Sequence, residues 1–145
     1  MHAIAVRTAV AGLTLAAVLG ISSGALAETM TFKAKMDAAS SVPPNDSKAT
    51  GSAEATYDTA SKMLTWNVDF SGLTGPATAA HFHGPAEVGK NAPVAILIAN
   101  NPTSPAKGSA TLTDAQAADL MAGRWYVNVH TMANRGGEIR GWLAK

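Results

Sequence analysis

The chain has 145 residues, with 11 Lys and Arg against 10 Asp and Glu, and no cysteine. A net charge this close to zero argues against nucleic acid or an anionic membrane surface as the partner. The lack of cysteine excludes disulfides, thiolate metal ligands and thiol catalysis.

Residues 1–27 have the pattern of an export signal. Arg7 supplies a positive charge, residues 9–19 form an apolar run too short to span a bilayer, and Ala25-Leu26-Ala27 is a small-x-small cleavage site. We therefore expect cleavage between Ala27 and Glu28, a periplasmic or secreted product, and no stable membrane insertion. Residues 28–145 would remain as a single domain whose basic and acidic side chains balance.

Apolar and polar residues alternate along most of this domain, which is the period of half-buried β-strands. The clearest example is the segment with Leu64, Trp66, Val68 and Phe70. Clusters of Gly, Pro and Asn separate the segments, so we predict a mainly β fold: a Greek-key-like antiparallel β-sandwich, with a barrel as the alternative. About eight short strands are expected, near residues 32–36, 53–57, 64–70, 78–83, 94–98, 108–112, 125–130 and 138–143.

One short helix is expected between the sixth and seventh strands. Thr113 is a good N-cap, and Gln116 three residues later completes a capping box. Gly123 suits the C-terminal stop. The apolar face is predicted to consist of Ala117, Leu120 and Met121.

Three histidines remain once the signal, which holds His2, is removed: His81, His83 and His130. Residues two apart on a strand project from the same side with Cβ atoms roughly 6–7 Å apart, so His81 and His83 can face one ion. A third imidazole from another strand gives a three-nitrogen set that leaves a position for water or substrate, as copper, zinc or iron sites do. The alternative is that these are surface histidines, or histidines that only link loops through hydrogen bonds.

Strand alternation extends the set of candidate residues. In the seventh strand Val127 and Val129 should face the core, which leaves Tyr126, Asn128 and His130 on the opposite side. In the last strand, Ile139 and Leu143 should face inward and leave Glu138, Arg140 and Trp142 outward.

If these two strands pair as a hairpin, His130 lies near Glu138 or Arg140. Glu138 is then a candidate to orient an imidazole N–H, or to act as a weak ligand. Arg140 is a candidate to guide an anion toward the metal. The alternative is an ordinary charged pair between Glu138 and Arg140 on the solvated face.

Several motifs together resemble the CHRD domain family, the module first recognised as a repeat in chordin. They are Ala80-His81-Phe82-His83-Gly84-Pro85-Ala86, then Tyr126-Val127-Asn128-Val129-His130-Thr131, and finally Gly137-Glu138-Ile139-Arg140-Gly141. The resemblance covers residues 30–143. It implies a β-sandwich-like domain found in exported microbial proteins, and in chordin as part of a binder of growth factors.

A second, weaker resemblance is to copper/zinc superoxide dismutases, which also carry a His-x-His pair on a sandwich strand. It implies that His81, His83 and His130 are copper ligands and that Arg140 or Arg135 guides the anion. The chain departs from that family because it has no bridging histidine, no zinc cluster and no cysteine for a disulfide.

The sequence thus predicts an exported metal carrier or scavenger, with copper favoured and iron or zinc as alternatives. A second hypothesis is a superoxide dismutase-like enzyme acting on a small oxidant at the same site. A third is a structural or protein-binding module without a metal. If the histidines are ligands, metal affinity should fall between pH values of about 7 and 5, because an imidazole binds only when neutral.

Overall fold

The computed structural model describes residues 26–145, so the expected export signal lies outside the described residues except for its last two. All eight predicted strands are present, and one helix, α1 (Asp114–Met121), follows the sixth. The strands are β1 (Thr29–Asp37), β2 (Thr50–Asp58), β3 (Met63–Ser71), β4 (Ala77–His83), β5 (Val94–Asn100), β6 (Ala106–Thr111), β7 (Tyr126–Thr131) and β8 (Ile139–Trp142).

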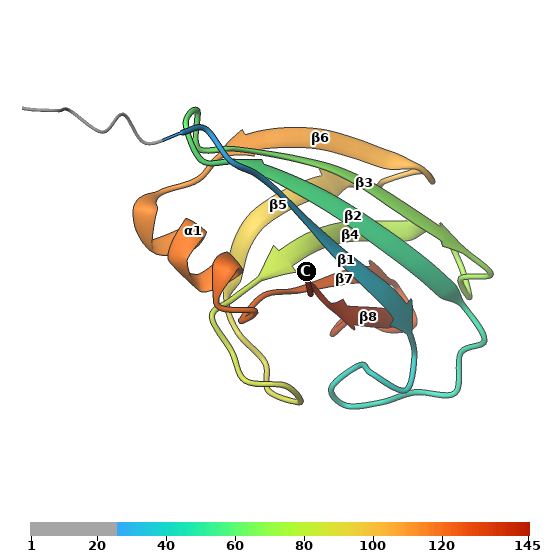
Figure 1. The fold of residues 1–145 in the computed structure, drawn as a ribbon. Helices are drawn as coiled ribbons and strands as arrows, with labels where there is room; N and C mark the ends of the chain where they lie inside the picture. The colour runs from blue at the N-terminus through green and yellow to red at the C-terminus, as the bar shows by residue number, and fades with distance from the viewer. Residues whose placement is uncertain (1–25) are drawn as a thin grey trace, which may run out of the picture.

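The strands form one antiparallel sheet in the order β5-β4-β7-β8-β1-β2-β3-β6. The sheet curls, so that β1, β2, β3 and β6 cross over β4, β5, β7 and β8 (Figure 1). Trp66 of β3 meets Phe82 of β4 edge to face with ring centroids 5.5 Å apart, which places the two halves on opposite sides of one core. The mainly β, antiparallel, eight-stranded prediction is therefore confirmed, and one sheet curled around its core is consistent with the predicted sandwich and with its barrel alternative.

The two halves are joined where β8 pairs with β1 in the middle of the sheet. Arg140 lies opposite Asp37, and the backbones of Lys33 and Ala144 exchange hydrogen bonds of 2.7 and 2.9 Å. Gly141 is required at this junction, because a Cβ there would lie 2.2 Å from the carbonyl oxygen of Lys35. The first and last strands of the domain thus hold the sheet together.

Strand alternation is confirmed in the core. Val127, Val129 and Ile139 are fully buried, and Leu64 and Val68 of β3 are as well. Tyr126 and Asn128 point away from this core, yet both are also buried, because they are covered by side chains and loops on the second face of the sheet. We call this second face of β4, β7 and β8 the outer face.

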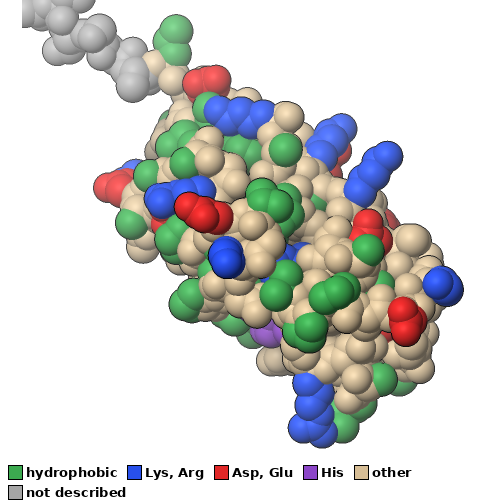
Figure 2. Space-filling model, turned by 90° about the horizontal axis from the view of Figure 1, so that it is seen from below, with side chains coloured by type: hydrophobic (Ala, Val, Ile, Leu, Met, Phe, Trp, Pro, Cys, Tyr) green, Lys and Arg blue, Asp and Glu red, His purple; other side chains and the backbone are tan. Residues whose placement is uncertain are grey.

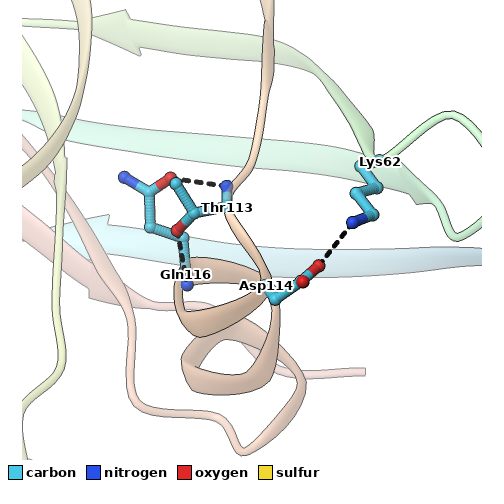
Figure 3. Close-up of polar contacts among 4 residues, drawn as sticks. All are labelled: Lys62, Thr113, Asp114 and Gln116. Carbon is cyan, nitrogen blue, oxygen red and sulfur yellow. Dashed lines mark hydrogen bonds and ion pairs between the residues drawn. The ribbon is translucent and has the colours of Figure 1, made fainter.

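Helix α1 forms as predicted. Thr113 accepts from the backbone N–H of Gln116, and the Gln116 side chain accepts from the backbone N–H of Thr113 (Figure 3). The Gln116 amide also donates to the carbonyl of Ala95, which ties the helix to β5. Asp114 pairs with Lys62 at 2.6 Å. Ala117 and Leu120 are buried as predicted, whereas Met121 is 39% exposed, so the apolar face is narrower than expected.

Basic and acidic side chains are scattered over the face shown in Figure 2, with no large area of one sign. A histidine side chain reaches the surface there beside apolar groups. Within residues 26–145, no helix has the length and hydropathy needed to cross a bilayer.

Candidate metal centre

The three histidines come from two neighbouring strands. His81 and His83 lie on β4 and His130 lies on β7, and in the register His81 is opposite Asn128 while His83 is opposite Tyr126. One ring nitrogen from each histidine lies within 4.8 Å of those of the other two. Strand alternation thus brings the three predicted ligands together on the outer face.

His81 and His130 are the closest pair. Nδ1 of His81 lies 3.0 Å from Nε2 of His130. Two nitrogens bound to one ion at about 2.0–2.1 Å would be separated by about 2.9–3.4 Å at right-angled to tetrahedral geometry. His83 is farther away, because its ring centroid is 5.4 Å from that of His81 and 6.3 Å from that of His130. The spacing of the pair is that of two ligands of one ion and also that of an N–H···N hydrogen bond, and His83 must move inward to share such an ion.

Backbone carbonyls fix the orientation of two of the rings. Nδ1 of His130 lies 2.8 Å from the carbonyl oxygen of Arg135, and Nδ1 of His83 lies 2.9 Å from that of Ala92. A carbonyl oxygen only accepts, so in a neutral ring each Nδ1 carries the proton and each Nε2 keeps its lone pair. Nε2 of His130 then accepts a hydrogen bond from Nδ1 of His81. Ligand histidines commonly donate their second nitrogen to a carbonyl in this way.

The environment keeps the histidines on β4 neutral. Burial, with contributions from His130 and His83, lowers the pKa of His81 to about 4. Burial also lowers the pKa of His83, although its hydrogen bonds to Ala92 and Asn128 act in the opposite direction. Neutral imidazoles are the form that binds a metal, so the donor set suits a borderline transition-metal ion.

Arg140 lies on the outer face, next to the histidines. His83 of β4 stacks on Tyr126 of β7 with centroids 4.8 Å apart and planes 5° from parallel, and the Arg140 guanidinium lies 3.5 Å from the same ring. Arg140 donates to Asn91 at 3.0 Å and to the carbonyl of Lys90, and it is only 2% exposed. Its charge therefore lies near His83, but its guanidinium holds the β4–β5 loop and is shielded from solvent.

Glu138 is not brought to the histidines. Its carboxylate accepts four hydrogen bonds: from Ser47 Oγ at 2.6 Å, from Thr131 Oγ1 at 2.6 Å, and from the backbone N–H and Oγ1 of Thr74 at 2.9 and 2.7 Å. Burial acts to raise its pKa, but these donors outweigh that effect and lower it to about 2. Glu138 thus holds the β1–β2 loop, the β3–β4 loop and the end of β7 together, and it neither contacts a histidine nor pairs with Arg140.

The position of Glu138 differs from the sequence prediction because the ladder is irregular there. The regular pairing of β7 with β8 ends at Val129 and Ile139, and the backbone N–H of Glu138 donates to the carbonyl of Val129 at 2.8 Å. Gly137 before it has a φ of 118°. Strand alternation holds only within a regular ladder, so the Glu138 side chain turns to the side of Thr131, opposite the histidines.

A scan against protein-family models matches the CHRD domain over residues 32–143. The chain belongs to the CHRD domain family. This confirms the resemblance seen in the sequence over nearly the same span. Comparison with curated proteins and with solved structures gave no match. All three histidines of this CHRD domain fall within the matched residues.

The sequence did not predict the backbone groups that orient the imidazole rings of His83 and His130 in this CHRD domain. The carbonyls of Ala92 and Arg135 belong to loops, and a loop carbonyl has no signature in the side-chain pattern. Asn128 is different. It was placed on the same face as His130 by alternation, and in the structure its amide lies 3.1 Å from Nε2 of His83.

Proposed function

We propose that this CHRD domain is an exported metal-binding protein that holds one transition-metal ion through His81, His83 and His130. The observation that supports it most strongly is the convergence of the three rings: one nitrogen of each lies within 4.8 Å of those of the other two. The carbonyls of Ala92 and Arg135 hold Nδ1 of His83 and of His130, which leaves Nε2 of each for an ion.

Copper is the favoured ion. Three neutral imidazoles suit it, and affinity among divalent first-row metals is highest for copper at comparable sites. Three protein ligands leave a position for a further ligand, and the chain offers no thiolate for storage of several ions. A carrier or scavenger that takes up one ion after export is therefore the function that the site supports best.

Turnover of superoxide is the second candidate function. The burial of Arg140 makes this function less well supported than metal transport or scavenging. An anion-guiding arginine must reach the solution near the metal, whereas Arg140 is 2% exposed and donates to Lys90 and Asn91. Superoxide consumption by the copper-loaded protein, compared with the same amount of free copper, separates the two functions. Turnover well above that of free copper would favour the enzyme.

The test of metal binding is titration of the purified domain, residues 28–145, with Cu(II) and Zn(II) by calorimetry. We expect one ion per chain, a higher melting temperature on loading, and loss of both in His81→Ala and in His130→Ala. Glu87→Gln, which removes an exposed carboxylate of the β4–β5 loop, is the matched control. Unchanged affinity in both histidine variants would refute the site, and no metal-dependent rise in melting temperature would favour the structural module.

A further inference from the structure

Asn128 occupies the centre of the outer face. It lies opposite His81 on one neighbouring strand and opposite Arg140 on the other, and His130 follows it by two residues on β7. It is only 4% exposed. Its amide is therefore largely shielded from bulk water, and most of its possible partners lie among these neighbours.

The partner that it has is the ring nitrogen that a metal would need. The structure places Oδ1 of Asn128 3.1 Å from Nε2 of His83, while Nδ1 of that ring is committed to the carbonyl of Ala92. Two acceptors on one ring require an imidazolium. If His83 is neutral and its Nδ1 donates to Ala92, its Nε2 carries a lone pair and can only accept. The side-chain amide of Asn128 must then be rotated by 180°, so that its Nδ2 donates to Nε2 of His83. The two amide orientations have nearly the same shape, and the hydrogen bonds decide between them.

Binding of an ion reverses this requirement. Once the ion takes the lone pair of Nε2, an amide N–H pointing at that nitrogen has no acceptor, and its positive end faces a cation. The oxygen end of the same amide is attracted to the cation and is itself a metal ligand type. Because the side chain is buried, it cannot escape to solvent, and a rotation of the amide is the smallest change that satisfies it.

We propose that Asn128 is a fourth, switching group of the metal centre: its NH₂ donates to Nε2 of His83 before an ion binds, and its oxygen turns toward the ion afterwards. This rests on the proposed function. It also explains why His83 is held away from the closely spaced His81 and His130 pair, since the bond to Asn128 must break before His83 can move inward. In the protein without an ion, Asn128 thus supplies a hydrogen bond to the buried Nε2 of His83, and the rotation of its amide frees that nitrogen when an ion binds.

The first test needs no mutation. The side-chain amide signals of Asn128 are followed by ¹⁵N NMR while Zn(II), which is diamagnetic, is added to the wild-type domain. We expect a large shift of the Asn128 NH₂ signals at one equivalent, and no comparable shift for Asn67, which lies on the distant strand β3. Unmoved Asn128 signals in a domain that binds zinc would overturn the inference.

The second test uses two variants with opposite expectations. Asn128→Leu removes both roles and should weaken Cu(II) binding by about 10- to 100-fold. Asn128→Asp, which keeps an oxygen but cannot donate, should bind at least as tightly as wild type, and Asn67→Leu is the control. Equal affinity of Asn128→Leu and wild type, with unchanged Cu(II) electron paramagnetic resonance, would refute the role of Asn128 alone. A wild-type domain that binds neither metal would refute the proposed function as well.

Discussion

Nδ1 of His81 lies 3.0 Å from Nε2 of His130, and the two rings meet edge to face with centroids 4.9 Å apart. Burial opposes a positive charge on His81, and the neighbouring rings of His130 and His83 add to that cost, so the pKa of His81 is lowered. His81 therefore resists protonation in the folded protein, as buried His83 does, and this has two consequences that can be measured.

The first concerns stability without a metal. The pKa of His81 is lowered to about 4 in the folded state, against about 6.5 in an unfolded chain. Between these values the unfolded state binds more protons, so the free energy of unfolding falls as pH drops from 6.5 toward 4 and then levels off for this group. Denaturant unfolding at several pH values measures this slope. His81→Gln should flatten it, and a wild-type slope in that variant would contradict the assignment.

The second concerns metal release. The sequence alone suggested release between pH values of about 7 and 5, from unperturbed histidines. Because burial lowers the pKa of both His81 and His83, protons compete less well for these ligands, and we expect most of the bound copper to remain at pH 5.5. Apparent affinity measured against a competing chelator from pH 7.5 to 4 tests this. Complete release by pH 6 would show that the two rings titrate normally.

Glu138 should contribute strongly to stability although it is not a ligand. Glu138→Gln replaces an acceptor of four hydrogen bonds by a group with one acceptor oxygen, which should cost about 1–3 kcal/mol of unfolding free energy. Its pKa of about 2 lies below the ordinary value, so its contribution is complete above pH 4.5 and is lost as pH falls toward 2. Chemical denaturation measures both effects.

The matched control for this change is Glu54→Gln, which removes one partner of an exposed ion pair with Lys33. It should alter the unfolding free energy by less than about 0.5 kcal/mol. Equal effects of the two substitutions would mean that the hydrogen bonds around Glu138 add little.

Gly141→Ala should be among the most damaging single substitutions in the domain. Its new Cβ would lie 2.2 Å from the carbonyl oxygen of Lys35, so β8 and β1 must separate for the methyl group to fit. Gly136→Ala, five residues earlier, meets nothing within 4 Å and is the control. We expect Gly141→Ala to lower the melting temperature by more than 10 °C, consistent with a cost of several kcal/mol. A similar melting temperature for both variants would contradict the tight packing of β8 on β1.

Strand periodicity was sufficient to predict the eight strands and the shared face of the three histidines, and the Thr113–Gln116 capping box was sufficient to predict the helix. It works there because His81, His83 and His130 lie in regular ladders, where alternation fixes which side a residue faces. It failed for Glu138, because the ladder ends at Ile139. The burial of Arg140 was also missed, since Lys90 and Asn91 reach it from a loop 49 or 50 residues away in sequence.

The pairing of β8 with β1 also determines when the fold can be completed. A chain that emerges from its N-terminal end has β1, β2 and β3 available early, but β1 has no partner on its other edge until the last strand arrives. Until then the exposed edge of β1 is open to wrong partners, and contacts of such long sequence separation form slowly. The half of the sheet that carries the histidines can thus pair with β1 only at the end of folding. An ion that binds the three histidines in the folded domain would therefore stabilise the chains in which this last pairing has formed.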